Sequence, residues 1–259
     1  MFAAKMQERS HARRVEEDIP FKRFEVSQRV EHLLLMISFT GLVITGLPQK
    51  FYSEEWAAGI ILLLGGVEFT RMLHRFLAAL FVLESLYHSI YIAVGVLRGR
   101  QAPSMIPSLQ DVRDAFTMLR FCLGVSNRRP KFDRFDYRQK FEYWGVVLGA
   151  LIMIVTGLIL WFPTYATYIL PGELVPAAKE MHGGEALLAF LVIVVWHLYS
   201  VHLSPVHFPG DTSIFTGKLS TRKMIHEHPL EYARVKGVPI VDEEESSEFV
   251  VSAERGEGR

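Results

Sequence analysis

Residues 181–203 read MHGGEALLAFLVIVVWHLYSVHL. From residue 184 onward the stretch is almost unbroken apolar sequence of roughly 20 residues, the length that an α-helix needs to cross the hydrocarbon core of a bilayer. It also carries His182, His197 and His202. Ionisable groups inside a membrane are costly and are functional by default. The stretch therefore predicts a membrane-spanning helix whose histidines serve a function.

Three further runs have similar length and composition, and 50% of the 259 residues are hydrophobic. They cover residues 27–47, 72–97 and 141–162. A shorter run at residues 56–67 has only about 12 residues, too few to span a bilayer, and is typical of an interfacial or re-entrant segment. We therefore expect an all-α membrane protein, a four-helix transmembrane bundle with one short interfacial helix.

The chain contains an internal repeat. At an offset of 111 residues, RVEH at 29–32 aligns with KFEY at 140–143, and ITGL at 44–47 aligns with VTGL at 155–158. The second and fourth spans align as well, with His74 on His182 and, after one inserted residue, His88 on His197. We therefore expect two repeated helical hairpins related by an axis along the membrane normal, which places equivalent histidines at equal depth.

The spacing of these histidines is close to a whole number of helical turns. The 14 residues from His74 to His88 rotate an ideal helix by about 1,400° and advance it by about 21 Å, so the two rings face the same way near opposite membrane faces. The 15 residues from His182 to His197 overshoot four turns by about 60°, which a local irregularity can absorb. Because a neutral imidazole nitrogen gains a partner by ligating haem iron, two such helices predict two stacked, non-covalent haems b.

Depth along the spans suggests how the histidines pair. His74 and His182 lie at the outer ends of their spans and predict an outer haem, while the repeat pairs His88 with His197 for an inner haem. His32 and His202 lie near the inner surface and could bind a third haem.

Other polar residues in the spans have two interpretations each. Arg71 and Arg75 flank His74 and suit haem propionates, or act as anchors at a helix end; Arg29 has the same two roles at the inner side. Glu84 lies one turn before His88 and either carries protons for a quinone or hydrogen-bonds a histidine.

Charge predicts the orientation in the membrane. Residues 98–140 hold ten Lys/Arg, whereas residues 49–70 and 163–185 hold one lysine each. The positive-inside rule then puts both termini in the cytoplasm, with residues 1–26 and 204–259 as cytoplasmic segments around a membrane domain at 27–203. We expect a multi-pass protein of the bacterial inner (cytoplasmic) membrane, surrounded by membrane lipid. No secretory signal peptide is expected. Because the net charge is zero, we expect no nucleic-acid partner.

Cysteine chemistry limits the cofactors. Cys122 is the only cysteine, so no disulfide, covalent haem attachment or cysteine-ligated iron–sulfur cluster forms within this chain.

Four stretches carry a family resemblance: RVEHLLLMISFTGLVITGLPQKF, LGGVEFTRMLHR, FDRFDYRQKFEYW and EALLAFLVIVVWHLYSVHLSP. They resemble the membrane cytochrome b subunits of formate dehydrogenases, nickel–iron hydrogenases and thiosulfate-reductase-type complexes, together with bacterial cytochrome b561. The resemblance implies four haem ligands, at His32, His74, His182 and His197. The chain departs from that pattern by adding His88 and His202, so the partner of His197 and the choice between two and three haems stay open.

These features together predict an integral membrane haem b electron-transfer subunit that has no catalytic residue of its own. It would link the quinone/quinol pool to a partner subunit with iron–sulfur clusters or c-type haems. The competing hypothesis is a transition-metal transporter with intramembrane histidines, which would need converging carboxylates along a hydrated path, and Glu84 is the carboxylate within the spans that we assign to such a role.

Overall fold

The computed structural model describes residues 20–99, 103–205 and 207–240. Its contacts divide the chain into two units. Among the described residues, the membrane unit comprises 25–99, 143–205 and 207–215. Among the described residues, the loop–tail unit comprises 20–24, 103–142 and 216–240.

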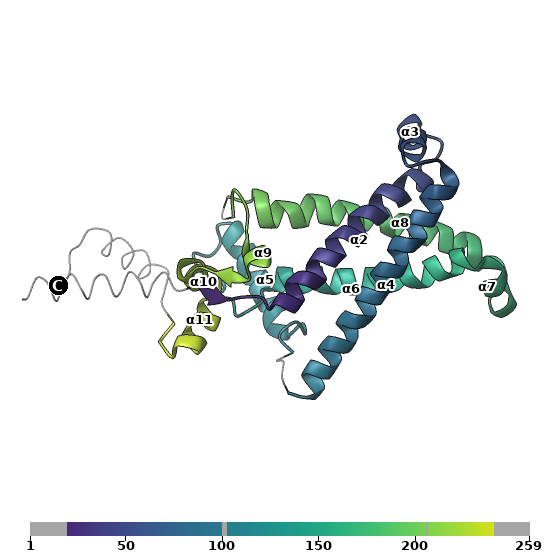
Figure 1. Ribbon diagram of the computed structural model, residues 1–259. Helices are drawn as coiled ribbons and strands as arrows, with labels where there is room; N and C mark the ends of the chain where they lie inside the picture. The colour runs from purple at the N-terminus through teal and green to yellow at the C-terminus, as the bar shows by residue number, and fades with distance from the viewer. Residues whose placement is uncertain (1–19, 100–102, 206, 241–259) are drawn as a thin grey trace, which may run out of the picture. The chain divides into compact units, whose positions relative to one another are not determined.

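The membrane unit is built from long apolar helices (Figure 1). They are α2 (Val26–Lys50), α4 (Val67–Leu97), α6 (Tyr137–Trp161) and α8 (Leu174–Leu191), which continues through the π-helical segments η1 (Val192–His197) and η2 (Tyr199–Leu203). In the described part of the chain these make four helices long and apolar enough to cross a membrane. The expected four-helix transmembrane bundle is confirmed.

Short helices join the spans. Helix α3 (Glu55–Leu63) lies between α2 and α4, where the short apolar run was expected, and α7 (Pro163–Ile169) lies between α6 and α8. Gly65 and Gly66 connect α3 to α4, and both have a φ of +95°. Side chains strongly disfavour that conformation, so the reversal into α4 depends on glycine.

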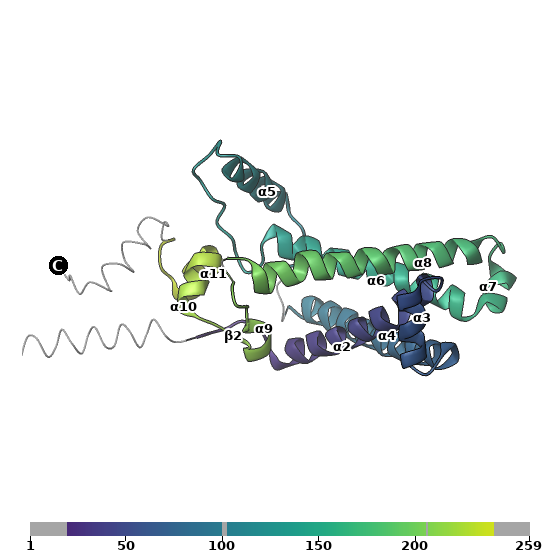
Figure 2. The ribbon, with the colours of Figure 1, turned by 90° about the horizontal axis from the view of Figure 1, so that it is seen from above.

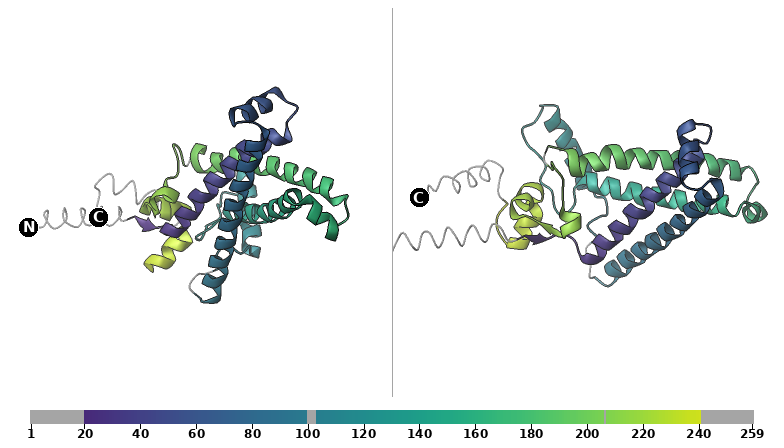
Figure 3. Two further views of the ribbon diagram at one scale, coloured as in Figure 1. Left: turned by 45° about the vertical axis from the view of Figure 1, so that its right-hand side comes forward. Right: turned by 45° about the horizontal axis from the view of Figure 1, so that its top comes forward.

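Helices α2 and α4 run antiparallel and side by side (Figure 3). On α2, Glu31, Ser38 and Thr45 are buried at intervals of seven residues. Thr45 reaches His74, and Glu31, 14 residues earlier, reaches His88, 14 residues later. The equal steps keep one face of each helix in contact over about four turns.

The residues on the inward face of α4 recur every three or four positions. Its buried or half-buried members include Thr70, His74, Leu77, Phe81, Glu84, His88, Tyr91 and Gly95. His74 and His88 therefore do face the same way, as their spacing predicted, and Glu84 shares their face.

The π-helical segments explain the unequal histidine spacing. A π-helix bonds i to i+5, so one turn consumes more residues than an α-turn. Segment η1 lies between His182 and His197 and ends at His197. The extra residue in the fourth span, compared with the second, is thus absorbed by the wider turns, and both hairpins present their histidines at similar rotations.

Helices α6 and α8 are joined at one end by α7 (Figure 2), and the Thr156 hydroxyl of α6 lies 2.9 Å from Nδ1 of His182 of α8. A Cβ added at Gly149 of α6 would lie 2.6 Å from a carboxylate oxygen of Glu185 of α8. Glycine at this position therefore makes room for an acidic side chain inside the fourth span.

The loop–tail unit joins three distant segments. Strands β1 (Phe21–Lys22) and β2 (Lys218–Leu219) pair antiparallel, with Phe21 opposite Leu219. The unit also holds helices α5 (Leu109–Cys122), α10 (Thr221–Glu227) and α11 (Pro229–Lys236), and α9 (Ser213–Thr216) leads into it. Buried Leu219 and Met224 form its small core.

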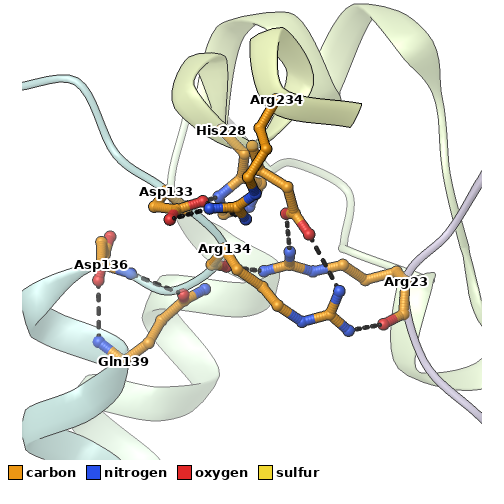
Figure 4. A network of polar contacts seen from close by, with 8 residues as sticks. Arg23, Asp133, Arg134, Asp136, Gln139, His228 and Arg234 are labelled. Atoms are coloured by element: carbon orange, nitrogen blue, oxygen red, sulfur yellow. Dashed lines mark hydrogen bonds and ion pairs between the residues drawn. The ribbon is translucent and has the colours of Figure 1, made fainter. Parts of the chain in front are cut away.

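A polar network holds the loop–tail unit together (Figure 4). Buried Glu231 accepts hydrogen bonds from Arg23 at 2.9 Å and from Arg134 at 3.0 Å. Each arginine also donates to the main-chain carbonyl of the other. Because the three residues come from the N-terminal segment, the central loop and the tail, the carboxylate crosslinks all three.

Candidate functional site

The outer histidine pair comes from α4 and α8. The ring centroids of His74 and His182 lie 6.4 Å apart, with an angle of 73° between the rings. Nδ1 of His74 lies 2.8 Å from the hydroxyl of Thr45 on α2, and Nδ1 of His182 lies 2.9 Å from the hydroxyl of Thr156 on α6. Each ring is thus held by a threonine of its own hairpin.

The threonines determine which ring nitrogen is free. The Thr45 hydroxyl donates to the Gly41 carbonyl at 2.7 Å, and the Thr156 hydroxyl donates to the Ile152 carbonyl at 2.6 Å. A hydroxyl has a single hydrogen, so each must accept from the histidine Nδ1–H. Nε2 is then the unprotonated nitrogen, the form that binds a metal.

Glycines leave space beside both rings. A Cβ at Gly46 would lie 3.0 Å from Cε1 of His74, and one at Gly157 would lie 3.2 Å from Cε1 of His182. These glycines and their threonines are the TG dipeptides that match in the two repeats. From the sequence, these dipeptides were predicted only as signs of a duplication, although their recurrence one helix away from each outer histidine was a signal of their role at the site.

The inner pair is His32 from α2 and His197 from the end of η1. Their ring centroids lie 6.3 Å apart, with an angle of 36°. Two imidazoles that ligate one metal ion from opposite sides, at about 2 Å from each nitrogen, place their ring centres on the order of 6 Å apart. Both pairs therefore have the spacing that a bis-histidine haem requires, and the glycines supply room beside the outer rings.

An arginine with spare hydrogen-bonding capacity lies next to the inner pair. A cavity of about 180 Å³ has both His32 and Arg29 in its lining. The Arg29 guanidinium donates to the carbonyl of Phe215, and its Nε is buried with no hydrogen-bond partner among the described residues. A haem propionate suits this donor.

His88 has other partners. Its Nδ1 lies 2.8 Å from a carboxylate oxygen of Glu31, and its Nε2 lies 3.1 Å from the hydroxyl of Tyr143. Both ring nitrogens are thus engaged, and the ring that faces His197 is that of His32. Glu31 and Tyr143 were not among the expected site residues, although Glu31 directly precedes His32 in the repeated motif.

His202 lies in η2 beside Gly210, where an added Cβ would be 2.7 Å from its Nδ1. Among the described residues no ring contact joins His202 to His32. The structure therefore does not bring together the two histidines that a third haem at this level would need.

Glu84 lies on the face of α4 that carries His88. One carboxylate oxygen of each residue is buried and has no hydrogen-bond partner among the described residues. The two carboxyl groups are close enough to interact electrostatically. Glu84 is therefore part of the same polar cluster as His88.

The two outer arginines lie around a cavity of about 540 Å³ that also includes Trp161. Arg71 makes an exposed ion pair with Glu68 at 3.2 Å. The guanidinium of Arg75 lies 5.8 Å from the centroid of the Trp161 ring. Both cations are exposed at the His74 end of α4, which is compatible with either role expected from the sequence.

Comparison with known proteins identifies the family. The sequence profile described as "Prokaryotic cytochrome b561" matches residues 16–208. The chain belongs to the prokaryotic cytochrome b561 family. Because the match covers all four spans, it includes both histidine pairs.

Named relatives agree with this assignment. The nitrate-inducible formate dehydrogenase cytochrome b556(Fdn) subunit of Escherichia coli (strain K12) is 21% identical over 223 residues, which cover 86% of this chain and 95% of that protein. The formate dehydrogenase cytochrome b556 subunit of Haemophilus influenzae is 24% identical over 71% of this chain and 72% of its own length. The formate dehydrogenase cytochrome b556(fdo) subunit of E. coli (strain K12) is 20% identical over a stretch that covers 69% of this chain and 77% of that protein.

The cytochrome b561-family chain is thus an integral membrane haem b electron-transfer subunit, as the sequence predicted. The resemblance to membrane cytochrome b subunits is confirmed. Family membership favours this function over the transition-metal transporter.

Proposed function

We propose that this subunit passes electrons between a quinone/quinol pair in the bilayer and a redox partner subunit, through two haems b. The outer haem would be held by His74 and His182, and the inner haem by His32 and His197. The observation that carries the proposal is the near-equal ring spacing of the two pairs, 6.4 and 6.3 Å. A bound haem b accepts and releases one electron, and ligation by two histidines leaves no iron position open to a substrate.

The side chains around each pair hold the ligands in place. Thr45 and Thr156 fix the outer rings through Nδ1, which leaves Nε2 for the iron. Arg29 near the inner pair, and Arg71 and Arg75 near the outer pair, would bind propionates, because guanidinium groups form charge-assisted bonds with carboxylates.

The two sites would lie near opposite ends of the bundle. His182 and His197 are 15 residues apart on one continuous helix, a rise on the order of 20 Å. Two haems at these levels provide a path for single electrons along the bundle.

Two haems fit the structure better than three. His88 uses both nitrogens in hydrogen bonds to Glu31 and Tyr143. His202, the remaining candidate, lies beside Gly210. Neither has the opposed imidazole that each proposed haem ligand has.

The proposed partner is an oxidoreductase subunit that carries iron–sulfur clusters or c-type haems. The similar proteins are named as subunits of formate dehydrogenases. Because Cys122 is its only cysteine, this chain cannot itself hold a cysteine-ligated cluster or a covalently attached haem. By the positive-inside rule we propose a bacterial inner-membrane location with both termini in the cytoplasm. Residues 1–26 and 204–259 would be the cytoplasmic segments, and residues 27–203 the membrane domain.

Optical spectra test the proposal directly. The purified chain should show a b-type band in the reduced-minus-oxidised spectrum, with two haems per chain by haem extraction. Anaerobic addition of menadiol should reduce the haems. Absence of the b-type band would refute the proposal, and a band that menadiol cannot reduce would refute its quinone part.

A further inference from the structure

Helix α5 of the loop–tail unit exposes an apolar face. Its large apolar residues recur every three or four positions, and on an ideal helix they fall within a sector of about 80°. They are Leu109, Val112, Phe116 and Leu119. All four are exposed, Leu109 by 78% and Phe116 by 64%. The described part of the chain therefore leaves this face uncovered.

The acidic residues of α5 lie on its packed side. Asp111 and Asp114 are about 120° and 180° from the centre of the apolar sector, and both are half-buried. A surface helix of a soluble domain does the opposite, because it buries its apolar stripe and exposes its charges. The apolar side of α5 therefore needs an apolar environment that the described chain does not supply.

One ion pair ties α5 to the start of a membrane span. Nζ of Lys140 lies 2.8 and 3.0 Å from the two carboxylate oxygens of Asp111, and these side chains are only 13% and 14% exposed. The same carboxylate accepts hydrogen bonds from the main-chain N–H and the hydroxyl of Ser108, the residue before α5. Lys140 is the fourth residue of α6, and the apolar run of the third span begins at the next residue, Phe141. The first turn of α5 is thus held within side-chain reach of the residue where the hydrophobic span begins.

Two arginines border the apolar face. Arg113 and Arg120 lie about 80° and 60° from the centre of the sector, both on its Leu109 side. Both are exposed, and among the described residues neither side chain forms an ion pair. At a bilayer surface, an arginine in this position lays its aliphatic part along the apolar layer while its guanidinium reaches the lipid phosphates. The positive charge favours anionic headgroups.

We propose that α5 lies in the plane of the bilayer surface, with its apolar face among lipid acyl chains and with Arg113 and Arg120 on the phosphates of anionic lipids. The bilayer is favoured over a protein partner because the loop that contains α5 leaves one span and enters the next, and the pair of Asp111 and Lys140 holds the helix at the second of these points. The proposal concerns the central loop and does not depend on the haems.

Spin labels test the position of α5 in the full chain, reconstituted into vesicles of phosphatidylglycerol and phosphatidylcholine. Because Cys122 is the only cysteine, Cys122→Ser provides a background in which Phe116→Cys or Leu119→Cys carries a single label. Oxygen concentrates in the hydrocarbon, and a nickel chelate stays in water. Both labels should collide mainly with oxygen, at a depth of about 5 to 10 Å in the boundary between headgroups and acyl chains. Gln110→Cys is the matched control: Gln110 is exposed on the same helix, about 140° from the centre of the sector, so its label should collide mainly with nickel.

The collision rates separate the possible occupants of the face. If nickel reaches the label at position 116 as readily as the label at position 110, the face is in water and the proposal fails. If the label is immobilised and shielded from both oxygen and nickel, a protein surface covers the face, and the proposal fails as well. The label at position 119 repeats the measurement, so a local disturbance at one position does not decide the result.

Lipid charge tests the two arginines. In vesicles with phosphatidylglycerol, Arg113→Gln combined with Arg120→Gln should raise the nickel collision rate at position 116, because the helix loses its attachment to the phosphates. In pure phosphatidylcholine the same substitutions should have no effect. Arg222→Gln, an exposed arginine of α10, is the control and should change nothing in either lipid. An equal effect of the double substitution in both lipids, or none in either, would overturn the binding of anionic headgroups.

Discussion

The hydroxyl oxygen of Thr45 lies 2.8 Å from Nδ1 of His74. The repeat-related Thr156 stands in the same relation to His182, at 2.9 Å. Each hydroxyl also donates to a carbonyl one turn earlier in its own helix. Both copies of the hairpin thus contain the same threonine–histidine hydrogen bond, which orients the outer histidine.

Removal of this hydrogen bond should weaken the outer haem. Thr45→Val keeps the shape of the side chain and deletes the hydroxyl, so the His74 ring loses the partner that fixes its tautomer. We expect haem affinity at the outer site to fall about 10- to 100-fold, the usual effect of losing such a partner. Haem retention during dilution measures it. Thr45→Ser should restore retention, and exposed Thr40→Val should leave it unchanged; equal retention in Thr45→Val would contradict the role.

Single-histidine variants should separate the two haems. His182→Ala should remove the outer haem and leave the inner one, because neither His32 nor His197 depends on it. His32→Ala should remove the inner haem, whereas His88→Ala should keep both. Pyridine haemochrome assays count the haems. Loss of a haem in His88→Ala, with none lost in His32→Ala, would instead pair His88 with His197.

The glycine beside each outer histidine should resist substitution. A Cβ at Gly46 would lie 3.0 Å from the His74 ring, so Gly46→Ala should displace the ring and lower occupancy of the outer site. Gly145→Ala is the control, since nothing lies within 4 Å of its added Cβ. In a helix interior alanine is favoured over glycine by about 1 kcal/mol, so a general loss of stability is not expected. Full haem occupancy in Gly46→Ala would show that the ring has room to move.

A reporter placed in the loop around Asp111 should be cytoplasmic. Ten Lys/Arg lie in residues 98–140, and positive loops stay on the cytoplasmic side. A reporter after Tyr52, in the turn between α2 and α3, should be exported. The opposite pattern would reverse the inner and outer assignments of both haem pairs.

The loop–tail unit should lose stability in mild acid. Burial lowers the pKa of His228, and nearby Arg23 lowers it further. Below about pH 6.5 the unfolded chain binds a proton at this position before the folded chain does, so the free energy of unfolding falls as the pH drops toward the folded pKa. At pH values above that range, the contribution of neutral His228 to the free energy of unfolding is fully retained.

Hydrogen exchange of residues 221–236 measures this effect, after correction for the intrinsic pH dependence of exchange. His228→Asn cannot titrate and keeps a donor near the Asp133 carbonyl, which Nδ1 of His228 contacts at 2.8 Å. The variant should exchange with no acid-induced increase, while His226→Asn should behave like the wild type. An unchanged acid response in His228→Asn would assign the effect to other groups.

The spans, their number and the repeat could be predicted from the sequence alone. A chain in lipid must satisfy its backbone hydrogen bonds internally, so four apolar runs of sufficient length imply four helices. The common face of His74 and His88 also followed from local periodicity, because a 14-residue step on one helix does not depend on its neighbours.

The partners of each histidine were decided only by the tertiary structure. Helical periodicity gives the direction of a side chain but not the register between two helices. The antiparallel register of α2 and α4 brings Glu31 to His88 and Thr45 to His74, and the π-helical turns of η1 rotate His197 toward His32. The pairing of His88 with Tyr143 depends on three helices at once, and no segment of the sequence contains that information by itself.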